Sequence, residues 1–476
     1  MRKKFPQTSA GIFVYNIYFT GVDKRQNACY DENRKDQNLI CDEKLKERLG
    51  YITMNGYQRQ VDFLDWEFGV FFHFGIRSFY PGHRDWDGIE MPAEGFNPKE
   101  LDCEQWIRIS KEAGATYAIM TCKHHDGFAL WPSKFSRYSV AQTPWKDGKG
   151  DVVREFTDAC RKYGLKVGLY YSPAQWGSHA IPFSNEKEYD DYFISQITEL
   201  LTNYGKIDYL WFDGCGSEGH EYDKKRIVAE MERLQPDMLT FGDPEWTQGI
   251  RWVGNEDGYA SLNNPLVVSA TDYSELSKEE PKLSHALFLP SECDCKIRNT
   301  WFYDLNEHTL KSLDELFGMY EMSVGHGSNF LLNIGPDNRG LLPEADAKRL
   351  LELGERIRAS FGTPLPYTEP QKNGDIYTME HADLGTRDWY QPRESRLSNC
   401  IMLKEDLTNG QSIRSFRIYG YLPNYRQKKI LLFEGRTVGH KVYCRFGALR
   451  CSKFEIEITD HDGDYILKDI KAFYIK

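Results

Sequence analysis

The sequence of 476 residues lacks features that define several common classes of protein. No lysine- and arginine-rich run stands out, and the net charge is -11, so nucleic acid is not an expected partner. No uninterrupted apolar stretch of about 18 or more residues occurs, so we expect no membrane-spanning segment. The 11 cysteines form no CxxC pair and no zinc-finger spacing, which argues against a small zinc domain.

The N-terminus also lacks a complete export signal. Met1-Arg2-Lys3-Lys4 is basic, and the apolar stretch from Ala10 to Phe19 follows it. Asn16 interrupts that stretch, however, and no A-x-A-like cleavage site comes soon after it. The cysteines are scattered and odd in number, which favours reduced thiols. We therefore expect a cytoplasmic protein rather than a secreted or periplasmic one.

Aromatic side chains, in contrast, are abundant at 14% of the chain. Most of them are expected to fill a core, and a minority to offer flat apolar faces on which sugar rings can stack. With 40% hydrophobic and 28% charged residues, the chain is too apolar to be disordered and long enough for two domains.

Three segments follow from the pattern along the chain. Residues 1–55 are polar and without a period, and we expect an irregular lead-in. Residues 56–361 alternate short β-rich runs with amphipathic helical runs, which predicts an α/β domain with a (β/α)8-like barrel. Residues 362–476 carry short alternating segments between Gly, Asp and Asn turns, which predicts a C-terminal β-sandwich domain.

Individual elements of the barrel can be placed on the sequence. The expected strands are residues 69–74, 116–121, 166–172, 207–212, 238–241, 286–289 and 329–334. The expected helices are residues 98–113, 151–163, 186–204, 223–234, 310–324 and 343–360. Gly114 and Gly164 each come just after a helical run, where a C-terminal cap would lie.

Polar side chains end four successive strand candidates. These side chains are His73 after the first, His124 and His125 after the second, Tyr170, Tyr171 and Ser172 at the third, and Asp213 after the fourth. The C-terminal ends of barrel strands form the reaction face of such folds, so these groups are expected to converge there. Asp213 is the candidate nucleophile or base.

A hydrolase that cleaves a glycosidic bond needs a second carboxyl group. Glu256 lies in an expected loop beside Trp252 and Gly254, and it is the favoured partner of Asp213. Glu292, which comes after the strand candidate at 286–289, is the alternative.

His124, His125 and Asp126 could instead bind a metal ion. Neighbouring residues of a strand point to opposite faces, and no H-x-H pair or further ligand cluster is evident downstream. We therefore expect no metal and no cofactor, and we keep a metal-dependent barrel hydrolase as an alternative.

Six motifs together resemble the α-L-fucosidases of glycoside hydrolase family 29. They are Phe71-Phe72-His73-Phe74-Gly75, Ala113-Gly114-Ala115-Thr116-Tyr117, Lys123-His124-His125-Asp126-Gly127-Phe128, Trp131-Pro132-Ser133, Gly168-Leu169-Tyr170-Tyr171-Ser172 and Trp211-Phe212-Asp213-Gly214. The resemblance implies a retaining double displacement with Asp213 as nucleophile. It also implies that fucose is bound by His73, His124, His125, Tyr171, Trp211, Arg251 and Trp301.

The stretch from Arg251 to Glu256 resembles the branch of the family that releases terminal α-1,3- and α-1,4-linked fucose from branched oligosaccharides and glycans, with Glu256 as acid/base. Three stretches depart from the family pattern, and the first is the lead-in before residue 55, which has no recognised counterpart. Asp85-Trp86-Asp87 stands where Glu-Trp-Gly is expected, although Trp86 could still line the sugar site, and Arg298-Asn299-Thr300 replaces a Pro-Gly turn. A catalytically silent glycan-binding protein on the same scaffold is the remaining alternative.

Overall fold

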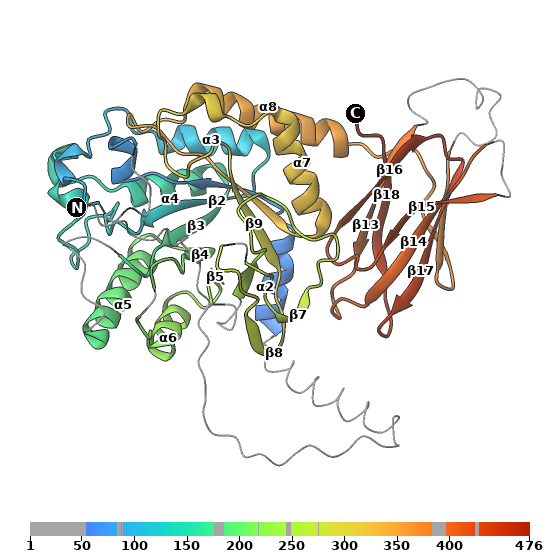
Figure 1. Ribbon diagram of the computed structural model, residues 1–476, viewed down its shortest axis with the longest axis horizontal. Helices are drawn as coiled ribbons and strands as arrows, with labels where there is room; N and C mark the ends of the chain where they lie inside the picture. The colour runs from blue at the N-terminus through green and yellow to red at the C-terminus, as the bar shows by residue number, and fades with distance from the viewer. Residues whose placement is uncertain are drawn as a thin grey trace, which may run out of the picture.

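A closed barrel followed by antiparallel sheets forms the protein (Figure 1). The computed structural model describes residues 54–82, 87, 89–175, 185–217, 219–243, 249–274, 276–382, 397–423 and 428–476. The predicted lead-in over residues 1–55 lies almost wholly outside this range, and so does Trp86. The predicted combination of a barrel and a C-terminal sheet domain is confirmed.

Eight parallel strands close the barrel, in the order β1-β2-β3-β4-β5-β6-β9-β10 with β10 pairing back to β1. The strands are β1 (Phe68–Phe72), β2 (Tyr117–Lys123), β3 (Lys166–Tyr171), β4 (Tyr209–Phe212), β5 (Leu239–Phe241), β6 (Gly249–Trp252), β9 (Ser291–Lys296) and β10 (Asn329–Asn333). Their apolar residues are buried on both faces, which is typical of parallel strands covered by helices.

The expected helices are all present, within a few residues of the predicted bounds. They are α3 (Cys103–Ala113), α4 (Val152–Tyr163), α5 (Glu186–Asn203), α6 (Lys224–Leu234), α7 (Leu313–Ser323) and α8 (Glu344–Phe361). Asp102 and Asp151 cap the first turns of α3 and α4 by accepting a backbone N–H, as N-cap carboxylates do. Gly114 and Gly164 adopt the left-handed conformation after α3 and α4, so the predicted glycine caps are confirmed.

One predicted barrel strand is wrong, and two barrel strands were not predicted. Residues 286–289 overlap β8 (Lys282–Phe288), which pairs with β7 (Val267–Ala270) in a separate antiparallel hairpin. β6 is only four residues long, and β9 reads Ser-Glu-Cys-Asp-Cys-Lys, so neither carries the apolar run on which the strand prediction rests. Glu292 and Asp294 of β9 are tolerated because they accept hydrogen bonds from Tyr117 and Trp252, and Lys296 is tolerated because it pairs with Glu256.

The bottom of the barrel is plugged by a helix that the sequence analysis did not anticipate, α2 (Met54–Leu64). Phe63 of this helix and the following Trp66 pack on Tyr117 and Tyr209, which begin β2 and β4. These rings belong to a buried cluster inside the barrel that also holds Trp211. The N-terminal end is thereby filled, and the reaction face is left to the C-terminal end.

The C-terminal domain is a sandwich of two antiparallel sheets with a shared apolar core. One sheet has the order β11-β12-β17-β14-β15 and the other β16-β13-β18. The strands are β11 (Gln371–Asn373), β12 (Ile376–Glu380), β13 (Ser398–Glu405), β14 (Ile413–Tyr421), β15 (Lys429–Gly435), β16 (Val442–Leu449), β17 (Lys453–His461) and β18 (Leu467–Phe473). Phe361, at the end of α8, stacks on Tyr443 of β16 at 4.2 Å between ring centroids and joins the two domains.

Among the described residues, no helix combines the length and the apolar character needed to cross a bilayer.

Candidate active site

Asp213 lies directly after β4, at the C-terminal end of the barrel, and its side chain is 16% exposed. Its Oδ2 accepts a hydrogen bond from the Tyr170 hydroxyl at 2.8 Å and lies 3.4 Å from Nε2 of His125. Its Oδ1 accepts the backbone N–H of Cys215 at 2.9 Å. The carboxylate is therefore held in a fixed orientation by three donors while one side of it stays accessible.

His125 and Asp213 form an ion pair. Burial alone would raise the pKa of Asp213, but the charge and hydrogen bond of His125 outweigh it and hold this pKa at about 2. Burial likewise lowers the pKa of His125, and the Asp213 charge overcomes it and raises that pKa to about 10. Ser172 donates its hydroxyl to the carbonyl of Ala174, so its oxygen accepts the Nδ1–H of His125 at 2.7 Å. Asp213 is consequently ionised at neutral pH.

Two neutral histidines line the same site. Burial lowers the pKa of His73 to about 3 and that of His124 well below its usual value. Nδ1 of His73 contacts Oδ1 of Asn333 at 2.8 Å; because an amide oxygen only accepts, Nδ1 carries the proton and Nε2 is left as an acceptor. His124 stacks on Tyr170 with 5.5 Å between centroids, and its buried Nδ1 has no hydrogen-bond partner among the described residues. Both imidazoles thus offer polar atoms suited to sugar hydroxyls.

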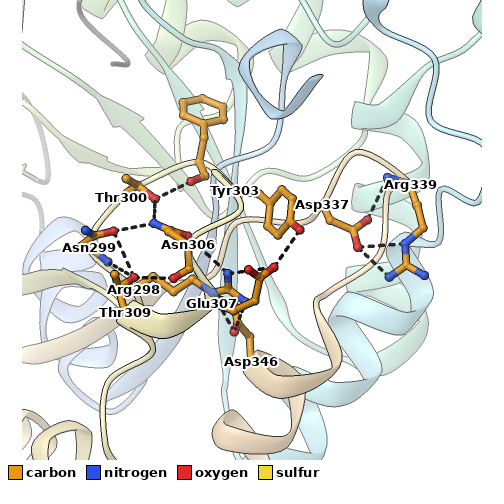
Figure 2. A network of polar contacts seen from close by, with 11 residues as sticks. Arg298, Asn299, Thr300, Tyr303, Asn306, Glu307, Thr309, Asp337, Arg339 and Asp346 are labelled. Atoms are coloured by element: carbon orange, nitrogen blue, oxygen red, sulfur yellow. Dashed lines mark hydrogen bonds and ion pairs between the residues drawn. The ribbon is translucent and has the colours of Figure 1, made fainter. Parts of the chain in front are cut away.

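An aromatic wall is supplied by Trp301, which lies in the loop after β9. Its ring is 4.8 Å from that of His73, and its carbonyl accepts a hydrogen bond from Nδ2 of Asn333 at 2.7 Å. Figure 2 shows how the loop is tied down: the Arg298 guanidinium pairs with Asp346 of α8 at 2.8 Å. Residues 298–300, which replace the expected Pro-Gly turn, therefore fix the loop that carries Trp301 through polar contacts.

Within this loop, Asn306 is the central link of the network. Its amide donates to Oγ1 of Thr300 at 2.8 Å and to Oδ1 of Asn299 at 2.5 Å (Figure 2). The residues flanking Trp301 are thus fixed to each other as well as to α8.

Glu256 lies on the same rim, in the segment between β6 and β7, and its side chain is 27% exposed. Its Oε2 is 2.5 Å from Nζ of Lys296, the last residue of β9. That amine also lies 4.4 Å from the centroid of Trp301, whose other neighbour is His73. Glu256 is therefore connected to the Asp213 site by a continuous series of contacting side chains.

His124, His125 and Asp213 could each offer one ligand atom to a metal ion, since those atoms lie within 4.8 Å of one another. Asp213 lies with the two histidines in this group, which was not predicted from the sequence. Asp126, the acid considered at first, is not part of this group; it accepts the N–H of Phe128 and faces Arg77 at 3.6 Å.

Comparison with known proteins decides the family. The family model described as Alpha-L-fucosidase matches residues 80–360. The chain is 31% identical to α-L-fucosidase 1 of Arabidopsis thaliana, over 80% of each protein. The chain belongs to the α-L-fucosidase family. It is therefore a glycoside hydrolase, and the predicted resemblance to family 29 is confirmed.

Solved structures of α-L-fucosidase family members share the fold. A glycoside hydrolase 29 family member from an unknown rumen bacterium superimposes with a TM-score of 0.75, at 28% identity, over 88% of this chain and 77% of that one. A Ruminococcus gnavus GH29 fucosidase in complex with fucose superimposes with a TM-score of 0.72 at 24% identity, over 89% of this chain and 94% of that one, which supports the fold alone.

The structure places two predicted fucose-binding residues of this α-L-fucosidase outside the site. Tyr171 points away from the barrel interior: its hydroxyl donates to Gln196 of α5 at 2.6 Å. Arg251 is buried on the outer side of β6, where it donates to the carbonyls of Leu289 and Pro265. In both cases the neighbouring residue faces inward, because side chains alternate along a strand. Those neighbours are Tyr170 and Trp252.

Glu292, the alternative acid/base, is also misplaced in the prediction. It lies within β9, a strand that was not predicted, and it is fully buried. Its carboxyl group accepts hydrogen bonds from the hydroxyls of Tyr117 and Tyr209 and from the indole of Trp211. Burial raises its pKa to about 7. A carboxyl group sealed beneath the floor of the site cannot reach a leaving group, so this assignment is wrong.

The remaining predicted residues lie in or under the site: His73, His124, His125 and Trp301 form its walls, and Trp211 forms its floor by stacking on Tyr170 at 5.3 Å. Three contributors were not predicted, namely Asn333, Lys296 and Asp294. Asn333 ends β10, so the strand-end rule that found Asp213 applies to it as well. The other two lie in β9, which carries no strand signal.

The ion pair makes a testable prediction about pH. In His125→Gln the cation that lowers the pKa of Asp213 is gone and burial remains, so this pKa rises. Asp213 then becomes protonated at a higher pH, and the acid limb of kcat/KM should move upward by about one to three pH units. The pH profile on an aryl fucoside measures this.

A matched control is His220→Gln, because His220 is also buried and lies 3.0 Å from a carboxylate, that of Asp190. Its acid limb should stay at the wild-type position. An unchanged acid limb in His125→Gln would show that this histidine does not control the charge of Asp213.

Proposed function

We propose that this α-L-fucosidase is a retaining exo-enzyme that releases terminal α-1,3- and α-1,4-linked fucose from branched oligosaccharides or glycans. The observation that carries the proposal is Asp213: an ionised, oriented and partly exposed carboxylate at the C-terminal end of the barrel. Such a group can attack an anomeric carbon and form a glycosyl-enzyme.

The second carboxyl group of the mechanism is Glu256. Its position at the rim supports transfer of a proton to the leaving oxygen and then activation of water from the same face. Its partial exposure supports contact with both the leaving sugar and solvent. Glu292 offers neither, because its carboxyl group is enclosed by three donors.

Exo action is supported by the walls around Asp213. The ring of His73 lies within 6 Å, between centroids, of the rings of both His124 and Trp301. A site walled by rings at this spacing suits one terminal sugar, with polar atoms of the histidines for its hydroxyls. The proposed linkage preference rests on the resemblance of residues 251–256 to one branch of the family.

The deciding experiment has two parts. A panel of linkage-defined fucosylated oligosaccharides, including a Lewis-type trisaccharide, is incubated with the enzyme next to an aryl fucoside. We expect fucose release from α-1,3 and α-1,4 linkages, and proton NMR of the first product should show the α-anomer. Release confined to other linkages would contradict the preference, and a β-anomer would contradict retention.

Chelation tests the metal alternative. If the carboxylates alone carry the reaction, dialysis against a strong chelator should leave kcat/KM of the aryl fucoside within about twofold, because no step then depends on a Lewis acid. Loss of activity that is restored by added zinc would instead assign a metal to His124, His125 and Asp213.

A further inference from the structure

β9 carries three ionisable side chains on its inward face: Glu292, Asp294 and Lys296 alternate along the strand. Glu292 lies lowest and is held by the two tyrosines and Trp211. Asp294 is next and accepts the indole N–H of Trp252 at 2.7 Å. Lys296 ends the strand at the rim. This row of three side chains therefore places the ammonium group of Lys296 at the level of the reacting groups.

The ammonium group of Lys296 occupies a defined place between the acid and the aromatic wall. It is 2.5 Å from Oε2 of Glu256 and 4.4 Å from the centroid of Trp301, and the side chain is only 19% exposed. A charge-assisted contact of this kind fixes the carboxylate more firmly than a contact in open solvent would, because water screens it less.

We propose that Lys296 is a positioning residue for the acid/base: it holds Glu256 beside Trp301 and places a positive charge against the carboxylate that must activate water in the second half of the reaction. The inference rests on the proposed role of Glu256. Lys296 would thus influence how Glu256 gives and takes its proton without contacting the glycosidic bond itself.

Glu256 is the main charged partner of Lys296, because burial favours the neutral forms of the other ionisable groups nearby. Burial and the charge of Glu256 raise the pKa of Asp294 well above its usual value, which favours the neutral form of Asp294. His73 is neutral as well, since burial lowers its pKa to about 3. Among the described residues, Asp294 on β9 is affected by the charges of both Lys296 and Glu256, and His73, which follows β1, is affected by the charge of Lys296.

The two half-reactions place opposite demands on Glu256. Protonation of the leaving oxygen needs the neutral acid, and attack of water on the fucosyl-enzyme needs the carboxylate. In the second step a proton passes from water to the Glu256 carboxylate as the new sugar–oxygen bond forms and the bond to Asp213 breaks. The positive charge of Lys296 lies beside the carboxylate with which this second step begins.

Lys296→Met keeps an apolar stem beside Trp301 and removes the charge. With an aryl fucoside of good leaving group, for which hydrolysis of the intermediate limits the rate, kcat should fall about tenfold. On an oligosaccharide, whose leaving oxygen needs a proton, the basic limb of kcat/KM reports the protonated acid, and it should move upward because the positive charge beside the carboxylate is gone. Lys296→Arg should restore both, and Lys296→Gln serves as a second neutral variant should the methionine form fold poorly.

Glu256→Ala and the double variant Glu256→Ala/Lys296→Met distinguish a failure of this inference from a failure of the proposed function. If Glu256 is the acid/base, adding Lys296→Met to Glu256→Ala should change the pH profile no further. A wild-type basic limb in both neutral variants, with Glu256→Ala behaving as an acid/base variant, overturns the inference alone. A Glu256→Ala enzyme that keeps the basic limb and is not rescued by azide overturns the proposed function itself.

Discussion

Asp213→Ala should lower kcat on every fucoside by about 10⁴-fold or more, because the variant has no group that can form the fucosyl-enzyme. Activity should return in part with azide. The small anion would attack the sugar in a single displacement and yield β-fucosyl azide, the inverted product. Steady-state kinetics and NMR of the azide product measure the two effects.

The control for this variant is Asp208→Ala. Asp208 stands just before β4, where it accepts the N–H of Val167 at 2.9 Å, so it lies at the opposite end of the same strand from Asp213. Groups at the N-terminal face of a barrel serve stability rather than chemistry. Asp208→Ala should therefore lose stability and keep kcat within several-fold. A comparable loss of kcat in both variants would mean that the effect of Asp213→Ala is structural.

Glu256→Ala should show the second large effect, and its size should depend on the leaving group. On oligosaccharides, whose leaving oxygen needs a proton, kcat/KM should fall by about 10²- to 10⁴-fold. On aryl fucosides with good leaving groups it should fall far less. Azide should accelerate turnover of these substrates by attacking the fucosyl-enzyme, and the product should be α-fucosyl azide because two displacements restore the configuration.

Glu292→Gln is the matched comparison, since it changes a carboxyl group in the same barrel without altering its volume. The amide disturbs the hydrogen bonds from Tyr117, Tyr209 and Trp211, so we expect a lower melting temperature and a similar fractional loss of activity on all substrates. Azide rescue of Glu292→Gln, together with its absence in Glu256→Ala, would exchange the two roles.

The sequence predicted the helices well because their ends are marked by local chemistry. Gly114 and Gly164 supply the left-handed residues after α3 and α4, so these two ends were predicted well, whereas the start of α3 was placed at residue 98, before its actual N-cap Asp102. Strands with apolar runs, such as β2, were also placed to within a few residues. These signals depend only on neighbouring residues, so no knowledge of the fold was needed.

β9 escaped prediction because its polarity makes sense only inside this barrel. Glu292 meets two tyrosines and an indole, Asp294 meets Trp252, and Lys296 meets Glu256. Each of these partners is remote in sequence, so no local sequence pattern reveals the pairing. Glu292 was kept as the alternative acid/base for the same reason, since the buried strand that holds it was not predicted.

The predictions of Tyr171 and Arg251 failed by one residue each. The rule that parallel strands end at one reaction face locates the end of a strand, whereas the face that a side chain occupies changes with every step along it. The structure selects Tyr170, which donates to Asp213, and Trp252, which donates to Asp294. His73, His124 and His125 converge with Asp213 at the barrel mouth as expected, and their contact with fucose stays a prediction.

Trapping the covalent intermediate tests the central role of Asp213 most directly. A 2-deoxy-2-fluoro-fucosyl fluoride reacts with a retaining enzyme in the first step and slows the second, so the labelled peptide can be sequenced by mass spectrometry. We expect one fluorofucosyl group on the peptide that contains Asp213, and none in Asp213→Ala. A label on another residue would contradict the assignment of the nucleophile.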